Sequence, residues 1–208
     1  MTAEVHIIGG GLAGSECAYQ LARRGVPVLL WEMRPVKSTP AHSTGDFAEL
    51  VCSNSLRSDD PFHAAGLLKR ELERFDSLVI ATARLAAVPA GSALAVDRER
   101  FAAAVTTALE SEDGIEIRRQ EVTALPSGDV VVATGPLTSD PIAEALAGLL
   151  GEEALYFYDS IAPVVDGETL EMSELFWASR YDKGGDDYLN SPLDRDAYLA
   201  FHRALLEA

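Results

Sequence analysis

A glycine-rich run near the start of the chain has the residue types and spacing of a phosphate-binding loop. Gly9-Gly10-Gly11-Leu12-Ala13-Gly14 satisfies the pattern G-x-G-x-x-G. The first glycine permits a tight turn, the second lets the backbone approach a pyrophosphate, and the third lets a helix pack closely on a strand. The N-terminus of that helix would offer N–H groups and partial positive charge to the phosphates. The alternative is a glycine-rich turn that binds nothing.

Glu32 ends a second apolar run, where an acidic side chain can accept a hydrogen bond from a ribose hydroxyl. The loop and this acid together predict a dinucleotide site, with FAD favoured over NAD. Two later features favour FAD without being specific to it. They are the small-residue turn Ala133-Thr134-Gly135 after a late strand, and Asp97-Arg98 at the start of a helix. Asp97 also has a plainer interpretation, because aspartate is a common helix N-cap.

Cys52 is the candidate nucleophile. It lies in a long polar loop beside Ser53, Asn54 and Ser55, with Arg57 close in sequence. A nearby cation or helix N-terminus would lower the pKa of such a thiol and raise its thiolate fraction. An inert buried cysteine is the alternative. Cys17 lies on the apolar side of the first predicted helix and is interpreted as a core residue.

The four histidines do not have the spacing of metal ligands, so no metal site is predicted. They are His6, His42, His63 and His202. His42 could face a ligand from its loop, although a solvated loop histidine is the plainer interpretation.

These groups need a scaffold, and the first 32 residues predict one. Val5–Ile8 and Val26–Trp31 are short apolar runs typical of buried parallel strands, and residues 14–24 between them have helical spacing. A strand, a helix and a strand in this order predict a right-handed crossover and a parallel sheet.

The rest of the chain continues the alternation of helices and strands. Residues 34–62 are polar and irregular, as in a functional loop. We expect helices at 64–78, 99–110, 140–150 and 198–208, and strands at 115–118, 121–125 and 130–133, with further aromatic strands after residue 155. No internal repeat is found.

Composition limits the classes of function. The net charge of -16 is concentrated in residues 101–208, which hold 6 Lys/Arg against 21 Asp/Glu, whereas residues 1–100 hold 11 against 12. This distribution argues against nonspecific polyanion binding, so any nucleic-acid surface must be a small patch or lie on chain not present here. No apolar stretch reaches the roughly 20 residues of a membrane span, and no secretory signal is found. A cytoplasmic protein with reduced thiols is expected.

Several segments occur together in an order that strongly resembles the folate- and FAD-dependent tRNA uridine-5-methyltransferase family (TrmFO). They include 9–16, 32–35, 39–42, 49–56, 66–69, 88–91, 94–99, 133–139 and 179–181. The resemblance implies a Rossmann-like α/β fold with an FAD-binding βαβ core of the glutathione-reductase type. It covers the N-terminal half of the family, so we expect the C-terminal part of the fold to be missing. Residues 1–178 would belong to the FAD-binding domain and residues 179–208 would begin an insertion domain that contacts tRNA.

The family's chemistry is implied on the same terms. 5,10-Methylenetetrahydrofolate gives a one-carbon unit to reduced FAD, which passes it to C5 of a uridine in the tRNA T-arm, and NAD(P)H supplies the electrons. A cysteine thiolate adds to uracil C6, and Cys52 matches one of the family's two cysteines. The glycine loop, Glu32, Met33, Arg34, Asp97, Arg98 and the Ala133–Gly135 turn would hold FAD.

Ser191 departs from the family pattern. It stands in Tyr188-Leu189-Asn190-Ser191-Pro192, where the family has its second cysteine. A thiol supplies some thiolate at neutral pH, whereas an unactivated hydroxyl supplies essentially none. Three interpretations therefore stay open: a tRNA methyltransferase, an FAD-dependent oxidoreductase without a nucleic-acid substrate, and a non-catalytic FAD-binding remnant.

Overall fold

The computed structural model describes residues 4–151, 165–179 and 185–207. Its contacts divide the chain into two compact units. Unit 1 comprises Met1–Val88 and Leu94–Pro163, and unit 2 comprises Pro89–Ala93 and Val164–Ala208. The contacts thus divide the chain before residue 178, and the assignment of residues 1–178 and 179–208 to an FAD-binding and an insertion domain stays a prediction.

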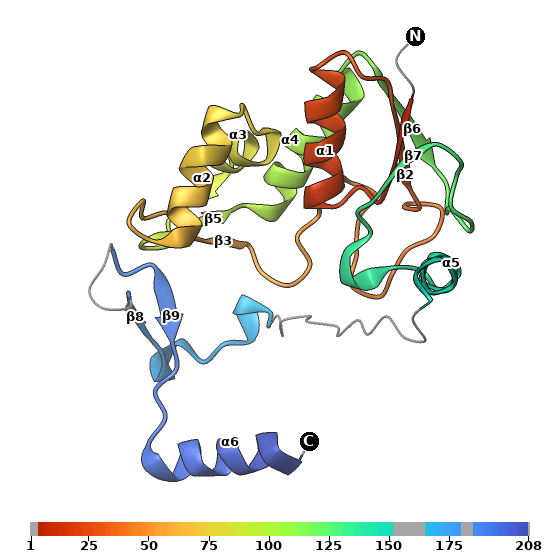
Figure 1. Cartoon of the computed structure of the whole chain (residues 1–208). Coiled ribbons are helices and arrows are strands. Elements are labelled where there is room, and N and C mark those ends of the chain that lie inside the picture. The colour runs from red at the N-terminus through yellow and green to blue at the C-terminus, as the bar shows by residue number, and fades with distance from the viewer. Residues whose placement is uncertain (1–3, 152–164, 180–184, 208) are drawn as a thin grey trace. The chain divides into compact units, whose positions relative to one another are not determined.

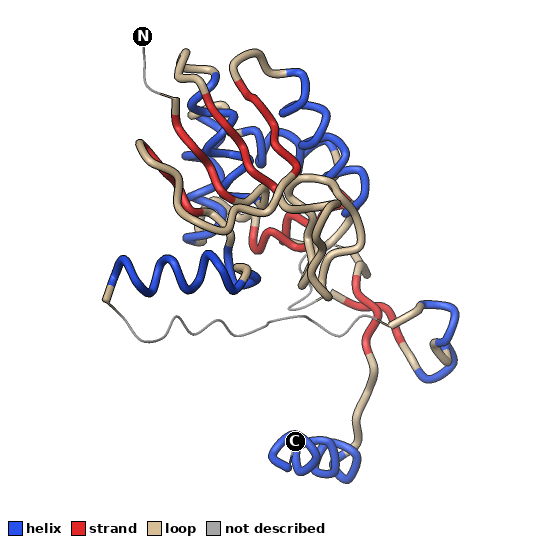
Figure 2. Tube along the Cα trace, turned by 90° about the vertical axis from the view of Figure 1, so that its right-hand side faces the viewer, coloured by secondary structure: helices blue, strands red, loops and turns tan. Residues whose placement is uncertain are grey.

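A four-stranded parallel sheet forms the centre of unit 1 (Figure 2). Its strands are β1 (Val5–Ile8), β2 (Val28–Glu32), β6 (Ile115–Arg119) and β7 (Asp129–Val132). Their spatial order is β6-β2-β1-β7, and Ile7 is in register with Leu30 on one side and Val131 on the other. This is the first part of the strand order of doubly wound nucleotide-binding sheets. The predicted βαβ unit and parallel sheet are confirmed.

Apolar runs form the two central strands because these strands pack into the core of unit 1. Ile7 and Leu30, which are partners on one face of the sheet, are fully buried in that core. The described part of unit 1 has five α-helices: α1 (Leu12–Ala22), α2 (Ala64–Arg74), α3 (Leu78–Leu85), α4 (Arg98–Ser111) and α5 (Asp140–Leu150). Figure 1 shows α1 and α4 on the same side of the sheet, with α2 and α3 farther out. The core between these layers includes Phe101, Val105 and Leu109 of α4.

The predicted helix at 64–78 is two helices. α2 ends at Arg74, and α3 begins after Ser77. The backbone of Asp76 is left-handed, with φ 54°, and the Ser77 hydroxyl accepts a hydrogen bond from the Ile80 amide at 3.2 Å. A left-handed residue followed by a serine cap ends one helix and begins the next.

A small second sheet holds the polar loop that follows β2. It comprises β3 (Ser55–Ser58), β5 (Ala93–Val96) and β4 (Ala87–Val88), in the order β3-β5-β4. The irregular segment expected at 34–62 therefore contains one strand. The strand predicted at 121–125 is wrong, because β6 is an edge strand that ends at Arg119 and the chain leaves the sheet there.

Unit 2 is described by itself. Its elements are the hairpin of β8 (Phe176–Ala178) and β9 (Tyr188–Asn190) and the helix α6 (Arg195–Glu207). The Tyr188 hydroxyl donates a hydrogen bond to the Ala90 carbonyl at 2.7 Å. The hairpin and α6 agree with the aromatic strands and terminal helix that were predicted, although residues 152–164 of that region lie outside the described part of the chain.

Candidate dinucleotide-binding site

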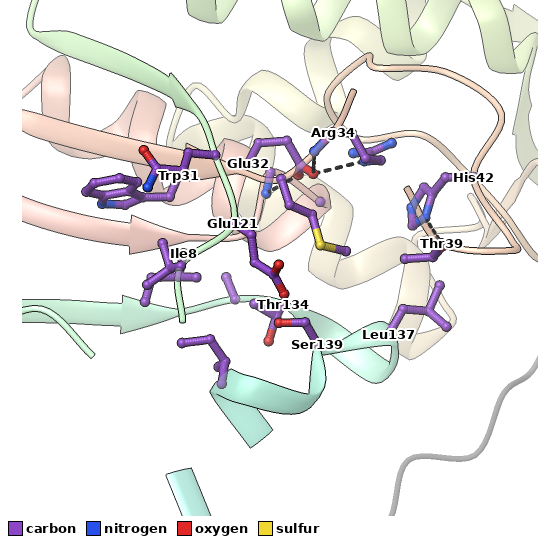
Figure 3. Close-up of a pocket in the computed structure, with 18 residues that line it drawn as sticks. Ile8, Trp31, Glu32, Arg34, Thr39, His42, Glu121, Thr134, Leu137 and Ser139 are labelled. Atoms are coloured by element: carbon purple, nitrogen blue, oxygen red, sulfur yellow. Dashed lines mark hydrogen bonds and ion pairs between the residues drawn. The ribbon is translucent and has the colours of Figure 1, made fainter. Parts of the chain in front are cut away.

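A pocket opens at the carboxyl ends of β1, β2 and β7 (Figure 3). Its space, including the open mouth, is about 600 Å³. In doubly wound sheets, ligands bind in the crevice outside these strand ends. The lining comprises Ile8, Gly9, Gly10, Gly11, Trp31, Glu32, Met33, Arg34, Thr39, His42, Gln120, Glu121, Val122, Ala133, Thr134, Leu137, Ser139 and Ile142.

The three spaced glycines differ in what surrounds them. Gly9 has φ 101°, and a Cβ there would come within 2.7 Å of the Ala133 carbonyl oxygen. A Cβ on Gly14 would overlap the carbonyl of Gly9, so helix and strand need this glycine to pack. A Cβ on Gly11 would meet no atom within 4 Å. The open side of Gly11 is where a phosphate can approach the backbone.

The N-terminus of α1 borders the same opening. Gly11 is the N-cap residue and supplies no capping side chain. The first N–H groups of a helix have no partner within the helix, and together with the helix dipole they attract anions. This end of α1 can therefore receive a pyrophosphate.

Gly10 connects the loop to three other segments. Its amide donates to Glu32 Oε2 at 2.8 Å, and its carbonyl accepts from the Ala48 amide at 2.8 Å and the Ser15 hydroxyl at 3.1 Å. Phe47, fully buried, lies where a side chain on Gly10 would be. Gly10 is thus fixed by protein contacts, and Gly11 is the position that stays open to a ligand.

Glu32, Arg34 and Glu49 form a chain of ion pairs behind the pocket. Arg34 Nε lies 3.0 Å from Glu32 Oε1, and Arg34 Nη1 lies 2.9 Å from Glu49 Oε2. The Arg34 side chain is only 3% exposed. A guanidinium removed from water in this way needs both carboxylates to compensate its charge. We call these three residues the carboxylate bridge.

Both carboxylates of the bridge stay ionised. Burial by itself would raise the pKa of Glu32, but hydrogen bonds and charge from Arg34, with the Gly10 amide, hold that pKa below its usual value. Burial likewise opposes ionisation of Glu49, and hydrogen bonds from Ser43 and Thr44 lower its pKa overall. Glu32 is therefore an anionic hydrogen-bond acceptor beside the phosphate loop.

His42 is half-buried and faces this pocket with Thr39. Its Nδ1 lies 2.6 Å from Thr39 Oγ1, which also accepts a hydrogen bond from the Ala41 amide. Burial, and next the positive charge of Arg34, lower the pKa of His42. The imidazole is thus neutral at pH 7. Since Thr39 Oγ1 already accepts from Ala41, its own proton is best placed on Nδ1 of His42, which leaves Nε2 as a donor.

The opposite rim carries Glu121, Thr134 and Ser139, as Figure 3 shows. Glu121 is paired with Lys37 Nζ at 2.7 Å, and Thr134 Oγ1 lies 2.6 Å from Thr138 Oγ1. These contacts connect the turn after β7 and the loop after β6 to the mouth of the pocket.

Most predicted cofactor residues line the pocket: Gly9, Gly10, Gly11, Glu32, Met33, Arg34, Ala133 and Thr134. Leu12, Ala13, Gly14 and Gly135 adjoin it without lining it. Asp97 and Arg98 lie apart from the pocket. Asp97 caps α4 by accepting the Arg100 amide at 3.0 Å, and Arg98 lines a separate cavity against loop residues such as Thr44. A cofactor role for these two residues stays a prediction.

The two candidate nucleophiles are both exposed. Cys52 is not part of the pocket lining. In the sequence it lies between Ala48, whose amide donates to the Gly10 carbonyl, and strand β3. Ser191 follows β9 in unit 2. Cys17 packs against the hydrophobic core, where burial raises the pKa of its thiol, as expected for a core residue.

Sequence reasoning missed several residues of the rim, including Trp31, Glu121, Leu137 and Ser139. Ser139 lies in segment 133–139, which carried the family resemblance, and this segment could have indicated a role in the site. Nothing in the sequence indicated such a role for Glu121, because it was expected in a strand. Among the described residues, no group of three or more His, Cys, Asp and Glu side chains could hold a metal ion. No helix in the described ranges is long and apolar enough to cross a membrane.

The parallel sheet, the phosphate loop and the acid after β2 define the class: a Rossmann-like α/β fold of the FAD-binding type. A model of the family described as "Glucose inhibited division protein A" matches residues 4–208. The chain belongs to this family. The solved structure of GidA from Aquifex aeolicus aligns with 65% of this chain and 25% of its own at a TM-score of 0.51 and 18% identity, which supports the fold.

Two curated relatives are much more similar in sequence. Both are named methylenetetrahydrofolate--tRNA-(uracil-5-)-methyltransferase TrmFO. The protein of Moorella thermoacetica is 57% identical over all of this chain and 48% of its own length, and that of Streptococcus gordonii is 53% identical over 98% of this chain and 46% of its own. The chain spans about half the length of these relatives.

Proposed function

We propose that this chain acts in the folate- and FAD-dependent methylation of uracil C5 in tRNA. The observation that carries the proposal is the pocket at Gly11 and Glu32, joined through Gly10 and Ala48 to the segment that bears an exposed Cys52. The names of relatives more than 50% identical over essentially the whole chain support the same reaction.

The residues present fit FAD. Gly11 leaves its side open, the N-terminus of α1 can receive the pyrophosphate, and Glu32 can accept a ribose hydroxyl. Glu32 Oε2 has one hydrogen bond, from Gly10, so an acceptor position remains on that oxygen. His42 lines the same space, and its Nε2 would carry the ring proton. Bound FAD would supply the carrier for the one-carbon unit and its reducing electrons.

Cys52 would supply the nucleophile. Addition of its thiolate to C6 of uracil makes C5 an enolate-like carbon that can accept an electrophilic one-carbon unit. Loss of the C5 proton then expels the thiolate, and a two-electron reduction, supplied in the end by NAD(P)H, converts the C5-bound methylene group to a methyl group. Methylenetetrahydrofolate would be the carbon donor and NAD(P)H the reductant. The partner would be the T-arm of tRNA, and the reaction would take place in the cytoplasm.

Mass analysis of undermodified tRNA tests the proposal. The tRNA is incubated with the protein, FAD, methylenetetrahydrofolate and NADPH, and the T-loop fragment is expected to gain one methyl group on uridine. Omission of the folate is the control and should abolish the gain. Bound flavin without any methyl gain would contradict the proposal for this chain.

Ser191 specifically favours a second candidate, an FAD-dependent oxidoreductase without a nucleic-acid substrate. A serine at this position removes one of the two thiols of the family pattern. Ser191→Cys separates the two candidates. A methyltransferase should respond with faster transfer to tRNA, whereas an oxidoreductase should consume NAD(P)H at an unchanged rate and methylate nothing in either form.

A further inference from the structure

The segment that carries Cys52 is fixed at both ends. We call residues 47–54 the Cys52 loop. At its start, the Ala48 amide donates to the Gly10 carbonyl at 2.8 Å, and fully buried Phe47 packs on Gly10. At its end, the Asn54 side chain donates to the Val96 carbonyl at 3.1 Å, and the Val96 amide donates to Asn54 at 2.9 Å. The span between these anchors is short and includes the exposed thiol.

Glu49 lies within this span and is held from two sides. Its Oε1 accepts the Ser43 amide at 2.8 Å, and its Oε2 accepts the Thr44 hydroxyl at 2.8 Å. Oε2 also lies 2.9 Å from Arg34 Nη1. The carboxylate bridge therefore runs from the Gly10 amide through Glu32 and Arg34 to a residue three positions before Cys52.

The bridge has few alternative arrangements. The Arg34 side chain is 3% exposed and that of Glu49 is 13% exposed, so a lost carboxylate would leave the Arg34 charge poorly compensated by water. A buried guanidinium with one carboxylate removed keeps a desolvated charge that is only half compensated. Charge-assisted hydrogen bonds of this kind also fix direction, because the planar fork of arginine matches carboxylates in few orientations.

Glu32 is at once the first member of the bridge and the acceptor that faces the pocket. We propose that Arg34 and Glu49 are positioning residues for Cys52, and that the bridge couples occupancy of the dinucleotide pocket to the position of this thiol. A ribose hydroxyl bound to Glu32 adds a contact to the first member of the bridge, and Arg34 transmits the added constraint to Glu49. The identity of the ligand, FAD, rests on the proposed function, and the bridge itself rests on the contacts above.

Alkylation of Cys52 measures the coupling without any methyl transfer. The 208-residue protein is treated with iodoacetamide with and without saturating FAD, and labelling of Cys52 and Cys17 is followed separately by peptide mass analysis. Saturating FAD is expected to slow labelling of wild-type Cys52 by at least about fivefold. Glu49→Gln keeps the size of the side chain but loses its charge. It should still bind FAD, with a Kd within about tenfold of wild type, yet change its labelling rate less than about twofold on saturation.

Arg70→Met is the matched control. It removes an exposed ion pair on α2, that with Glu73, and leaves the bridge and the pocket lining intact. Its Cys52 should keep the full FAD response. If Glu49→Gln keeps the same response as wild type, FAD shields the thiol directly and the coupling through the bridge is wrong. A thermal melt of each variant verifies that it is folded.

Amide hydrogen exchange tests the positioning role of Glu49 without FAD. If the wild-type protein binds no FAD, that result counts against the proposed function alone. Without ligand, Glu49→Gln should exchange the amides of the Cys52 loop at least about tenfold faster than wild type, and Arg70→Met should not. Equal exchange in all three proteins would overturn the positioning role of Glu49. If Glu49→Gln unfolds, Glu49→Asp replaces it in the test. Because Glu49→Asp keeps the charge, the amides of its Cys52 loop should keep part of the wild-type protection against exchange.

Discussion

The amide nitrogen of Gly10 lies 2.8 Å from Oε2 of Glu32, so the phosphate loop and the acid after β2 form one hydrogen-bonded unit. Glu32 is 6% exposed and also accepts the Arg34 amide and Nε, each at 3.0 Å. The carboxylate is therefore part of the fold before any ligand binds. Its orientation is set by the protein, which lowers the cost of ordering it when a ribose binds.

Replacement of Glu32 should destabilise the protein strongly. Glu32→Ala leaves the Gly10 amide without its acceptor and Arg34 with one carboxylate, and we expect a loss of about 3–5 kcal/mol in the free energy of unfolding. Urea unfolding measures this loss. Glu116→Ala, which breaks an exposed ion pair with Arg118 on the edge strand β6, should cost less than about 1 kcal/mol. Equal losses in the two variants would contradict a structural role for Glu32.

Gly11 and Gly14 should respond differently to the same substitution. Gly11→Ala places its Cβ in open space, so unfolding should change by less than about 0.5 kcal/mol while the Kd for FAD rises at least about tenfold. Gly14→Ala would overlap the Gly9 carbonyl and should cost about 1–3 kcal/mol. Denaturant unfolding and flavin fluorescence titration check the pair. Unchanged FAD affinity in Gly11→Ala would place the pyrophosphate elsewhere.

His42 should make stability depend on pH near neutrality. Burial and the charge of Arg34 hold its pKa below 6.5 in the folded protein. The unfolded chain therefore binds the proton first as the pH falls, so the stability that His42 contributes is complete above about pH 6.5 and declines as pH falls through its lower folded pKa. His42→Asn should flatten the stability profile in that window. An unchanged stability profile in His42→Asn would contradict this assignment.

The elements that sequence could predict are those with a strong local pattern. β1, α1, β2 and β7 combine apolar runs with glycine punctuation, and α5 was predicted with its observed bounds. β3 was missed because Ser55–Ser58 is polar and becomes a strand only by pairing with the distant β5. The false strand at 121–125 has the opposite cause: a local β pattern lies beyond the edge strand and finds no partner.

The site divides in the same way. The glycine loop and Glu32 could be predicted, because their spacing itself expresses the geometry of a phosphate loop. The role of Glu49 could not, since it depends on how deeply Arg34 is buried and on which carboxylates the fold brings to it. His42 was left between a ligand contact and a solvated loop residue, and its burial beside Thr39 favours the first.

Cys52 should be needed for methyl transfer and for little else. Its side chain is exposed, so Cys52→Ala should change the free energy of unfolding by less than about 0.5 kcal/mol and leave flavin absorbance intact. Transfer to tRNA should fall to background because no other thiolate is available to add to uracil C6. Cys52→Ser should also fail to transfer the methyl group, since an unactivated hydroxyl is not ionised at neutral pH.

Cys17→Ala is the matched control. It removes a thiol packed on the core and should lower stability but keep transfer per folded molecule. Unchanged transfer by Cys52→Ala would remove Cys52 from the mechanism, and equal loss in Cys17→Ala would point to unfolding rather than chemistry.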